Sequence, residues 1–247
     1  MAYFDQEQFD VRCEWGMGGV QRLAPSDVIV IVDVLSFSTS VDVALGRGAI
    51  ILPYRWKDDS AIQYAQEHSA ELAGTRNQVQ TEYSLAPSSL TAVPSGLRLV
   101  MPSLNGSSLS CEAMTSGAAI FTGCIRNASA VAAWAQKSGK RIAVIPAGER
   151  WPDGSLRPAI EDLVGAGAII HSLQGRRSPE ANAAVATFEC FRTSLRERLL
   201  LCSSGRELAE RGFVADVELA TELDVSGVAP ILTGDAFIAS AADEIVA

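Results

Sequence analysis

The chain has 247 residues, 48% of them hydrophobic, so it can bury the core of one large domain or of two small ones. Its formal charge of -9 and its lack of a Lys/Arg cluster argue against a nucleic-acid backbone or an anionic membrane surface as a partner, because both need a local basic field. A few arginines can still bind a small anion.

The cysteines and the N-terminal sequence both bear on the compartment. Five cysteines, an odd number without CxxC spacing, are expected to be free buried thiols, which suits a reducing cytoplasm. The acidic sequence MAYFDQEQFD differs from a signal peptide, which is basic and then apolar, and no apolar run approaches about 18 residues. We therefore expect neither export nor membrane insertion.

The first half of the chain alternates between strand and helix patterns. Residues 9–15 alternate apolar and polar, which predicts a strand with one exposed face, and 28–33 (VIVIVD) predict a fully buried strand. Further strands are predicted at 49–54, 97–102, 118–123 and 141–147. Helices are predicted at 58–70 and 127–138. This alternation predicts a largely parallel sheet with helices on its faces.

The second half is mainly helical. A helical pattern runs from about residue 158 through 180–202 and the sequence SGRELAERG, and 228–234 predict a last strand. Residues 75–95 are rich in Ser, Thr, Pro and Asn and predict a long loop, a kind of segment that is often functional. We predict a single α/β domain over residues 1–247, with two closely packed α/β lobes as the alternative.

Polar residues follow the predicted strands where ligands bind in open parallel sheets, at the carboxyl ends of the strands. Asp33 ends the second strand and is followed by the hydroxyls of Ser36, Ser38 and Thr39. This group could hold a metal or a nucleophile beside a phosphate-binding turn. Alternatively, Ser38 or Thr39 caps a helix and Asp33 bonds to nearby N–H groups.

Two further strand ends carry candidate anion-binding residues. Asn105 and Gly106 form a tight turn before a helix that begins near Ser107, where backbone could approach an anion closely. An ordinary turn with a serine cap is the alternative. Arg126 precedes a probable helix cap at Asn127 and could clamp a carboxylate or a phosphate, or could be a solvated surface arginine.

Acidic residues are concentrated between 147 and 167. Glu149 and Asp153 lie in a predicted loop, and Glu161 and Asp162 lie in the first turns of a helix entered at Pro158. The helix dipole alone favours carboxylates there. Together with Asp33, however, they would supply the hard oxygen ligands that Mg²⁺ requires.

Several other chemistries lack their motifs. His68 and His171 are too isolated for a histidine-based zinc site. No GxSxG elbow and no GxGxxG fingerprint is present, and Leu35 stands where the DxD phosphatase motif has its second aspartate.

Taken together, five motifs in one order resemble the 2-phosphosulfolactate phosphatase family: VDVLSFSTSV (32–41), LNGSS (104–108), RNASAV (126–131), PAGE (146–149) and AIEDLVGAGAI (159–169). The similarity runs across nearly the whole chain and ends in CSSGRELAERGFVADVELA (202–220). The resemblance implies a three-layer α/β/α fold with a largely parallel or mixed central sheet. It also implies Mg²⁺-dependent hydrolysis of the phosphate ester of a 2-hydroxy acid, in some organisms on the route to coenzyme M.

The resemblance carries over to particular positions. Asp33 matches the strand-end acid of the motif, Asn105 and Gly106 its Asn-Gly turn, Asn127 its Asn-Ala pair, and Glu161 with Asp162 its Glu-Asp pair. The chain departs from the commoner pattern at Ser36 and Phe37, where many relatives carry Arg-Ala, and at SLAPSS (84–89), where relatives have an Asn-Ser-Pro element. The missing arginine leaves the identity of the substrate open.

The resulting hypothesis is a magnesium phosphatase for a small anionic phosphorylated substrate. Mg²⁺ would be held by Asp33, Glu161 and Asp162 and would neutralise charge on the transferring phosphoryl group. The phosphate would be cradled by Ser36, Ser38, Thr39, Asn105, Gly106, Ser107 and Asn127. Arg76 and Arg126 would bind a second anionic group of the substrate.

Three alternatives stay open at this point. Asp33 could be a nucleophile that forms an aspartyl phosphate. The chain could be a small-anion-binding protein without turnover, or a different phosphate-ester enzyme on a similar sheet. We also expect a cytoplasmic protein and keep a homodimer as a prediction.

Overall fold

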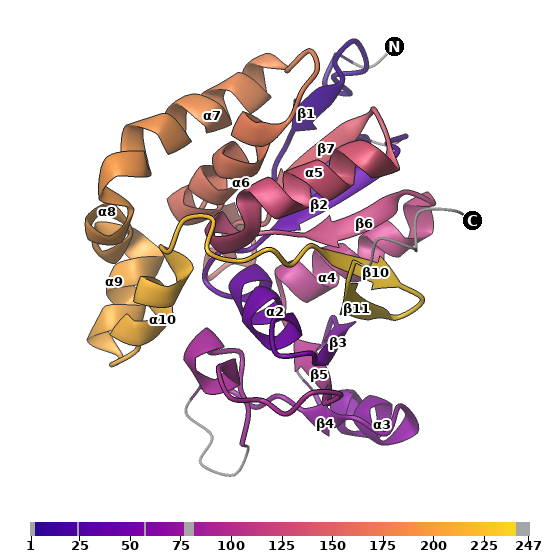
Figure 1. The fold of residues 1–247 in the computed structure, drawn as a ribbon, viewed down its shortest axis with the longest axis vertical. Coiled ribbons are helices and arrows are strands. Elements are labelled where there is room, and N and C mark those ends of the chain that lie inside the picture. The colour runs from indigo at the N-terminus through magenta and orange to yellow at the C-terminus, as the bar shows by residue number, and fades with distance from the viewer. Residues whose placement is uncertain (1–2, 24, 57, 77–81, 241–247) are drawn as a thin grey trace.

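The strands and helices alternate along the chain as far as α5 and are mostly helices afterwards (Figure 1). The computed structural model describes residues 3–23, 25–56, 58–76 and 82–240. The strands are β1 (Val11–Cys13), β2 (Val28–Val32), β3 (Ile50–Tyr54), β4 (Glu71–Leu72), β5 (Arg98–Pro102), β6 (Ala119–Thr122), β7 (Ile142–Pro146), β8 (Glu149–Arg150), β9 (Leu156–Arg157), β10 (Pro230–Thr233) and β11 (Ala236–Ala239). The helices are α1 (Gly16–Arg22), α2 (Phe37–Leu45), α3 (Ser60–Glu67), α4 (Gly106–Ala113), α5 (Ala128–Ser138), α6 (Ile160–Ser172), α7 (Pro179–Phe191), α8 (Leu195–Leu201), α9 (Ser203–Glu210) and α10 (Val214–Ala220). Short 3-10 turns are η1 (Pro87–Leu90), η2 (Met114–Ser116), η3 (Ile125–Asn127) and η4 (Arg192–Ser194).

The main sheet is mixed and has the strand order β1-β7-β2-β6-β10-β11-β3-β5-β4. Its first four strands are mutually parallel, and so are β3, β5 and β4. The antiparallel hairpin β10–β11 from the C-terminal part of the chain joins these two groups. Helices cover both faces, which gives the expected three-layer α/β/α arrangement (Figure 1).

The central strand β2 separates two apolar cores. Val30 and Val32 belong to one core with side chains of α5 and α6, whereas Ile31 belongs to the other with Phe37 of α2 and Leu109 of α4. All five residues of β2 are buried, as its continuous β-branched run predicts. Burying each such side chain contributes roughly 1.5–3 kcal/mol, so the end of β2 is a rigid place for a functional group.

Most predicted elements are confirmed with shorter bounds. The strands predicted at 28–33, 49–54, 97–102, 118–123 and 141–147 are β2, β3, β5, β6 and β7. The helices predicted at 58–70 and 127–138 are α3 and α5. The helical second half is confirmed as α6 to α10, although 180–202 is broken by η4. The loop predicted at 75–95 contains η1, and its residues 77–81 lie outside the described part of the chain.

The exposed face predicted for the first strand is wrong. All three residues of β1 are buried, and Arg12 is only 2% exposed. Its Nη2 donates to Ser26 Oγ at 2.7 Å and to the Pro25 carbonyl at 3.1 Å. Alternating polar and apolar residues predict an exposed strand face only where the polar side chains have no hydrogen-bond partners inside the protein. Arg12 has such partners.

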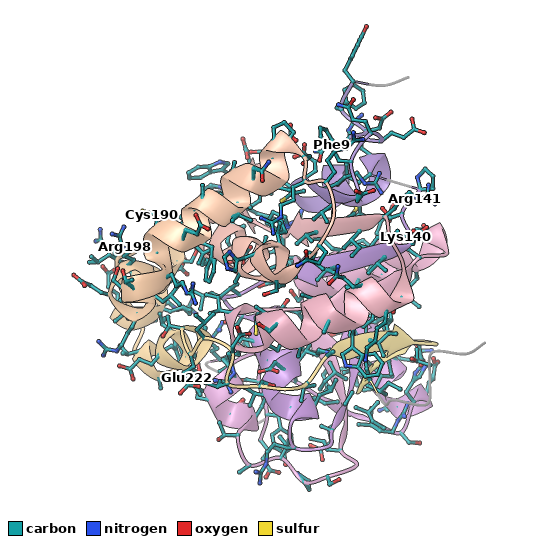
Figure 2. The ribbon with its side chains drawn as sticks, turned by 45° about the horizontal axis from the view of Figure 1, so that its top comes forward. Phe9, Lys140, Arg141, Cys190, Arg198 and Glu222 are labelled. Carbon is teal, nitrogen blue, oxygen red and sulfur yellow. The ribbon has the colours of Figure 1, made fainter. Side chains whose placement is uncertain are left out.

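The five cysteines are free, as expected, but they are not all buried. Cys190 is exposed on the outer side of α7, beside Arg198 of α8 (Figure 2). Among the described residues, no helix has both the length and the apolar character needed to cross a membrane.

Replacing Gly167 with alanine is expected to destabilise the protein by about 1–3 kcal/mol. Gly167 lies where α6 packs against α7, and a Cβ added there would meet the Ala184 backbone oxygen at 2.1 Å. Backbone cannot move aside as a side chain can, so the helices would have to separate. Urea unfolding measures this effect. Gly18→Ala is the matched control, because its Cβ would meet nothing within 4 Å and alanine favours the helix by roughly 0.5–1 kcal/mol. Equal stability of the two variants would contradict the packing argument.

Candidate active site

Asp33 lies at the carboxyl end of β2, between the first residues of two helices. Its Oδ1 accepts a hydrogen bond from the backbone N–H of Phe37 at 3.2 Å, and its Oδ2 accepts one from Gly106 at 2.8 Å. Phe37 begins α2 and Gly106 begins α4. Helix N-termini carry partial positive charge and unsatisfied N–H groups. The carboxylate is therefore oriented by both helices, and the ends of β2 and β5 meet at this point.

Asp162, in the first turn of α6, ties together the ends of two neighbouring strands. Its Oδ1 accepts from the Val34 N–H at 2.7 Å and its Oδ2 from the Gly148 N–H at 2.8 Å. The side chain is 3% exposed, and its burial, with the charges of Asp33 and Glu161, raises its pKa well above the usual range for an aspartate. Both of its oxygens thus support the backbone that follows β2 and β7.

Glu149, which the sequence analysis considered only as part of an acidic stretch, joins the same group. Its Oε2 accepts a hydrogen bond from Asn105 Nδ2 at 2.8 Å. Burial and the charge of Asp33 raise its pKa to about 7, although the bond from Asn105 opposes the shift. Glu161 is 2% exposed and also raises the pKa of Glu149. The structure therefore brings four carboxyl groups within electrostatic reach of one another.

A divalent cation fits the chemistry of this carboxylate group. Burial, and after it the charges of Asp33 and Glu161, raise the pKa values of Glu149 and Asp162, so a cation beside them would favour their ionised forms. Mg²⁺ prefers oxygen ligands and is commonly held by one or two carboxylates, with waters and substrate phosphate completing its coordination. Within the described ranges, no group of three or more Asp, Glu, His or Cys side chains is arranged so that it could hold a metal ion. The residues present thus suit a cation bound partly by water and substrate.

A cavity of about 310 Å³ opens beside Asp33. Asp33, Asn105 and Glu149 are among its lining residues, whereas Glu161 and Asp162 are buried and do not line it. Four arginines also line the cavity: Arg76, Arg150, Arg157 and Arg211. Ser36, Ser103, Ser204 and Glu207 complete its polar lining. A cavity lined by both carboxyl and guanidinium groups suits a small ligand with more than one negative charge that binds together with a cation.

The four arginines come from three distant parts of the chain and are held by hydrogen bonds. Arg76 belongs to the long loop, Arg150 and Arg157 to the β8–β9 hairpin, and Arg211 follows α9. Their partners are Asp216 and Ser36 for Arg76, the Leu104 carbonyl for Arg150, Ser204 for Arg157 and Glu207 for Arg211. Figure 1 shows α8, α9 and α10 gathered at one end of the sheet. Of these helices, α9 supplies Ser204 and Glu207 to the cavity, and Arg211 follows it.

The hydroxyls of Ser38 and Thr39, predicted to cradle phosphate, point into the protein instead, and so does the hydroxyl of Ser107, whose backbone amide was the predicted contact. Ser38, Thr39 and Ser107 are each 0% exposed and do not line the cavity. Ser38 Oγ accepts from the Asp33 N–H at 2.8 Å, Thr39 Oγ1 donates to the Val34 carbonyl at 2.8 Å, and Ser107 Oγ donates to the Met101 carbonyl at 2.7 Å. They stabilise the backbone that carries Asp33 and Gly106. Only Ser36, of the hydroxyls after β2, lines the cavity.

Arg126 and Asn127 lie away from the cavity that Asp33 lines. Arg126 Nε donates to Asp42 Oδ2 at 2.9 Å, and its Nη1 pairs with Glu222, which Figure 2 labels beyond the end of α10. It lines a separate cavity of about 400 Å³. Asn127 is buried, and its Oδ1 accepts from the Cys124 N–H at 2.8 Å, as a turn cap does. The guanidinium predicted to bind the substrate is thus used to fasten α2 and the segment after α10.

Sequence reasoning missed several cavity residues for different reasons. Arg150 and Arg157 are interleaved with the acids of 147–167, so the signal was present but only the acids were considered. Ser204, Glu207 and Arg211 lie about 170 residues from Asp33 in the stretch 202–220, which the family resemblance covers but to which no role was assigned, and only the tertiary fold places them at the cavity. Arg76, Ser36 and Asn105 were predicted and do line the cavity.

Comparison with known proteins gives a consistent picture. The family model described as 2-phosphosulpholactate phosphatase matches residues 19–235. The chain is similar to the probable 2-phosphosulfolactate phosphatase of Carboxydothermus hydrogenoformans, with 29% identity over 84% of this chain and 87% of that protein. It is 28% identical to the 2-phosphosulfolactate phosphatase of Methanothermobacter thermautotrophicus, over 85% and 89% of the two chains. The probable 2-phosphosulfolactate phosphatase of Thermus thermophilus is 27% identical, over 87% and 91%.

Proposed function

The chain belongs to the 2-phosphosulfolactate phosphatase family, and from this premise we propose that it hydrolyses the phosphate monoester of a small 2-hydroxy acid. The expected reaction converts 2-phosphosulfolactate and water into sulfolactate and phosphate. The observation that supports this proposal best is the cavity beside Asp33, which Glu149 and four arginines also line. Its volume of about 310 Å³ suits a small ester with several negative charges.

We propose Mg²⁺ as the cofactor, held by Asp33 and Glu161 at the carboxyl end of β2, with water and substrate oxygens completing its coordination. When bound there, it would neutralise the charge that develops on the phosphoryl oxygens. Asp162, unlike Asp33, does not line the cavity, and its two oxygens hold the N–H groups of Val34 and Gly148, so we assign it to holding the site's backbone.

The protein groups would orient the ester for displacement at phosphorus. Arg150 and Arg157 lie on the hairpin that carries Glu149 and can donate to the phosphoryl oxygens. The fixed orientation of Asp33 allows a second role, in which its carboxylate attacks phosphorus while the P–O ester bond breaks and the 2-hydroxy acid leaves with a proton on its oxygen. Water then attacks phosphorus of the aspartyl phosphate, which releases phosphate and restores the carboxylate. The free thiols suit a reducing cytoplasm, which we propose as the compartment.

Phosphate release with Mg²⁺ and with EDTA tests the proposal. The panel contains 2-phosphosulfolactate, 2-phospholactate and 2-phosphoglycerate, with a nucleoside monophosphate as a comparison ester. We expect release from the 2-hydroxy acid esters that falls to background in EDTA and returns when Mg²⁺ is added in excess. Release from the nucleotide alone would favour a different phosphate-ester enzyme. Thermal stabilisation by the esters without any release would favour the binding protein without turnover.

A further inference from the structure

Asp216 is a fully buried carboxylate in α10 that contacts the long loop on the opposite side of the site. The residue is 0% exposed. Its Oδ2 accepts from Arg76 Nε at 3.0 Å, and its Oδ1 accepts from the Ser88 N–H at 3.1 Å and from Ser88 Oγ at 2.5 Å. Burying a carboxylate is costly unless it is paired and hydrogen-bonded, and here both oxygens have partners.

Arg76 is held from three sides while it lines the cavity. Besides the bond to Asp216, its Nη2 donates to Ser36 Oγ, and its guanidinium lies over the ring of Phe213 at 5.6 Å from the centroid. The side chain is 13% exposed. A guanidinium has five N–H donors in one plane, so these contacts fix the plane without using every donor. Arg76 therefore presents donors to the cavity in a fixed orientation.

The distribution of charge around the cavity indicates where a second anionic group would lie. The wall formed by Asp33 and Glu149 repels any anion that is not accompanied by a cation. The phosphoryl group can approach this wall because the proposed metal lies there. A further carboxylate or sulfonate would have to face the guanidinium groups instead. Arg76 is the one of the four lining arginines that the described structure pairs with a fully buried carboxylate.

We propose that Asp216 is a positioning residue that holds Arg76 in place to bind the second anionic group of the substrate, the carboxylate or sulfonate that is not transferred. The inference rests on the proposed function, because it concerns the same cavity. Asp216 itself does not line this cavity and acts only through Arg76. A mobile arginine would lose conformational entropy on binding, whereas a fixed one would already have lost it.

Two esters that differ in one group test the proposal. 2-Phospholactate carries a carboxylate where isopropyl phosphate carries a methyl group. Arg76→Ala and Asp216→Asn are each expected to lower kcat/KM for 2-phospholactate by about 10- to 100-fold, mainly through KM, the range for losing a charged hydrogen bond. Both variants are expected to act on isopropyl phosphate within about threefold of the wild-type rate constant. The double variant is expected to be no worse than Arg76→Ala, because the two residues act as one unit. Replacing the carboxylate by a sulfonate shows which of the two oxyanions is preferred.

Two control variants separate positioning from a general loss of stability. Ser88→Ala removes one bond to Asp216 and leaves the bond to Arg76. Asp42→Asn breaks a comparably buried ion pair, with Arg126, outside this cavity. Both are expected to lower stability without changing the preference between the two esters. Should Asp216→Asn not fold, Asp216→Glu carries the test, since it keeps the charge and displaces Arg76.

The outcomes are distinguishable from failure of the proposed function. A loss that is equal for both esters in Asp216→Asn, or no loss while Arg76→Ala shows one, would overturn the inference. If the wild type releases no phosphate from any ester, the proposed function fails, and thermal stabilisation by 2-phospholactate replaces kinetics. The inference then expects stabilisation in Ser88→Ala and its loss in Arg76→Ala and Asp216→Asn. Equal stabilisation of all three would contradict it.

Discussion

Asp33→Asn is expected to lower kcat for phosphate release by about 10³-fold or more while the protein remains folded. The carboxylate ends β2 at the cavity wall and accepts N–H bonds from Phe37 and Gly106. Its negative charge is what either proposed role requires, because an amide is a poor ligand for Mg²⁺ and a poor nucleophile toward phosphorus. The measurement is phosphate release from 2-phosphosulfolactate at saturating Mg²⁺.

The fold should tolerate this substitution because asparagine has nearly the same shape. Its Oδ1 can still accept one of the two N–H bonds, and the loss of the other costs about 1–2 kcal/mol. Asp153→Asn is the matched control, since Asp153 is exposed in the β8–β9 turn and bonds only to Ser155 among the described residues. We expect the control to keep wild-type activity. An Asp33→Asn protein that is folded and retains a tenth of the activity would exclude both roles for Asp33.

Rapid quenching in acid distinguishes the two roles of Asp33. A nucleophile would leave an acid-stable, base-labile aspartyl phosphate on the wild-type enzyme, at a level set by the relative rates of its formation and hydrolysis. If Asp33 is only a metal ligand, water attacks phosphorus directly in a single displacement. No phosphoenzyme is then expected at any time point. Mapping the labelled peptide to residues 28–40 would identify the site directly.

The positions of strand-end residues could be predicted from the sequence because parallel strands impose a simple geometry. A continuous β-branched run identifies β2, and the residue that follows such a strand lies at the edge where ligands bind. Asp33 and Asn105 follow β2 and β5, and both line the cavity. The acidic stretch after β7 likewise brings Glu149 to the same wall. In each case, local pattern and sheet geometry agree.

The direction of the hydroxyl side chains could not be predicted in the same way. Ser36, Ser38 and Thr39 are close in sequence, but the turn into α2 directs Ser36 to the cavity and the other two to backbone groups. Short hydroxyl side chains bond readily to nearby backbone, and sequence does not show which partner is available. Arg126 illustrates the same limit over a long range, because its partner Asp42 lies 84 residues away.

The C-terminal part of the chain required the tertiary structure. The run 228–234 correctly predicted β10, but its hairpin with β11 enters the sheet between β6 and β3, far from its neighbours in sequence. The helices α9 and α10 likewise return to earlier parts of the chain, where Ser204 contacts Arg157 and Asp216 contacts Arg76. Such long-range returns depend on packing that no local period encodes.

Glu149→Gln is expected to stabilise the metal-free protein at pH 8 by up to about 3 kcal/mol relative to the wild type. The pKa of Glu149 is raised to about 7 in the folded protein, from an ordinary value of 4.5. Between these pH values the folded state keeps a proton that the unfolded state has lost, so stability falls as pH rises. Glutamine does not titrate and is free of this loss, so the two proteins should differ little near pH 4.5 and diverge up to about pH 7.

Urea unfolding in EDTA at pH 5 and pH 8 measures the effect, with Glu210→Gln as the control. Glu210 is exposed on α9 and pairs with Arg206. Replacing it with glutamine should change the free energy of unfolding by no more than about 0.5 kcal/mol. Adding Mg²⁺ at pH 8 is expected to stabilise the wild type, because a cation beside Asp33 and Glu161 offsets the two charges that disfavour ionised Glu149. The gain should be smaller in Glu149→Gln, which has one acidic charge fewer to compensate. A variant no more stable than the wild type at pH 8 would show that protein groups already compensate the charge of Glu149, and the argument for a cation at this wall would lose its electrostatic basis.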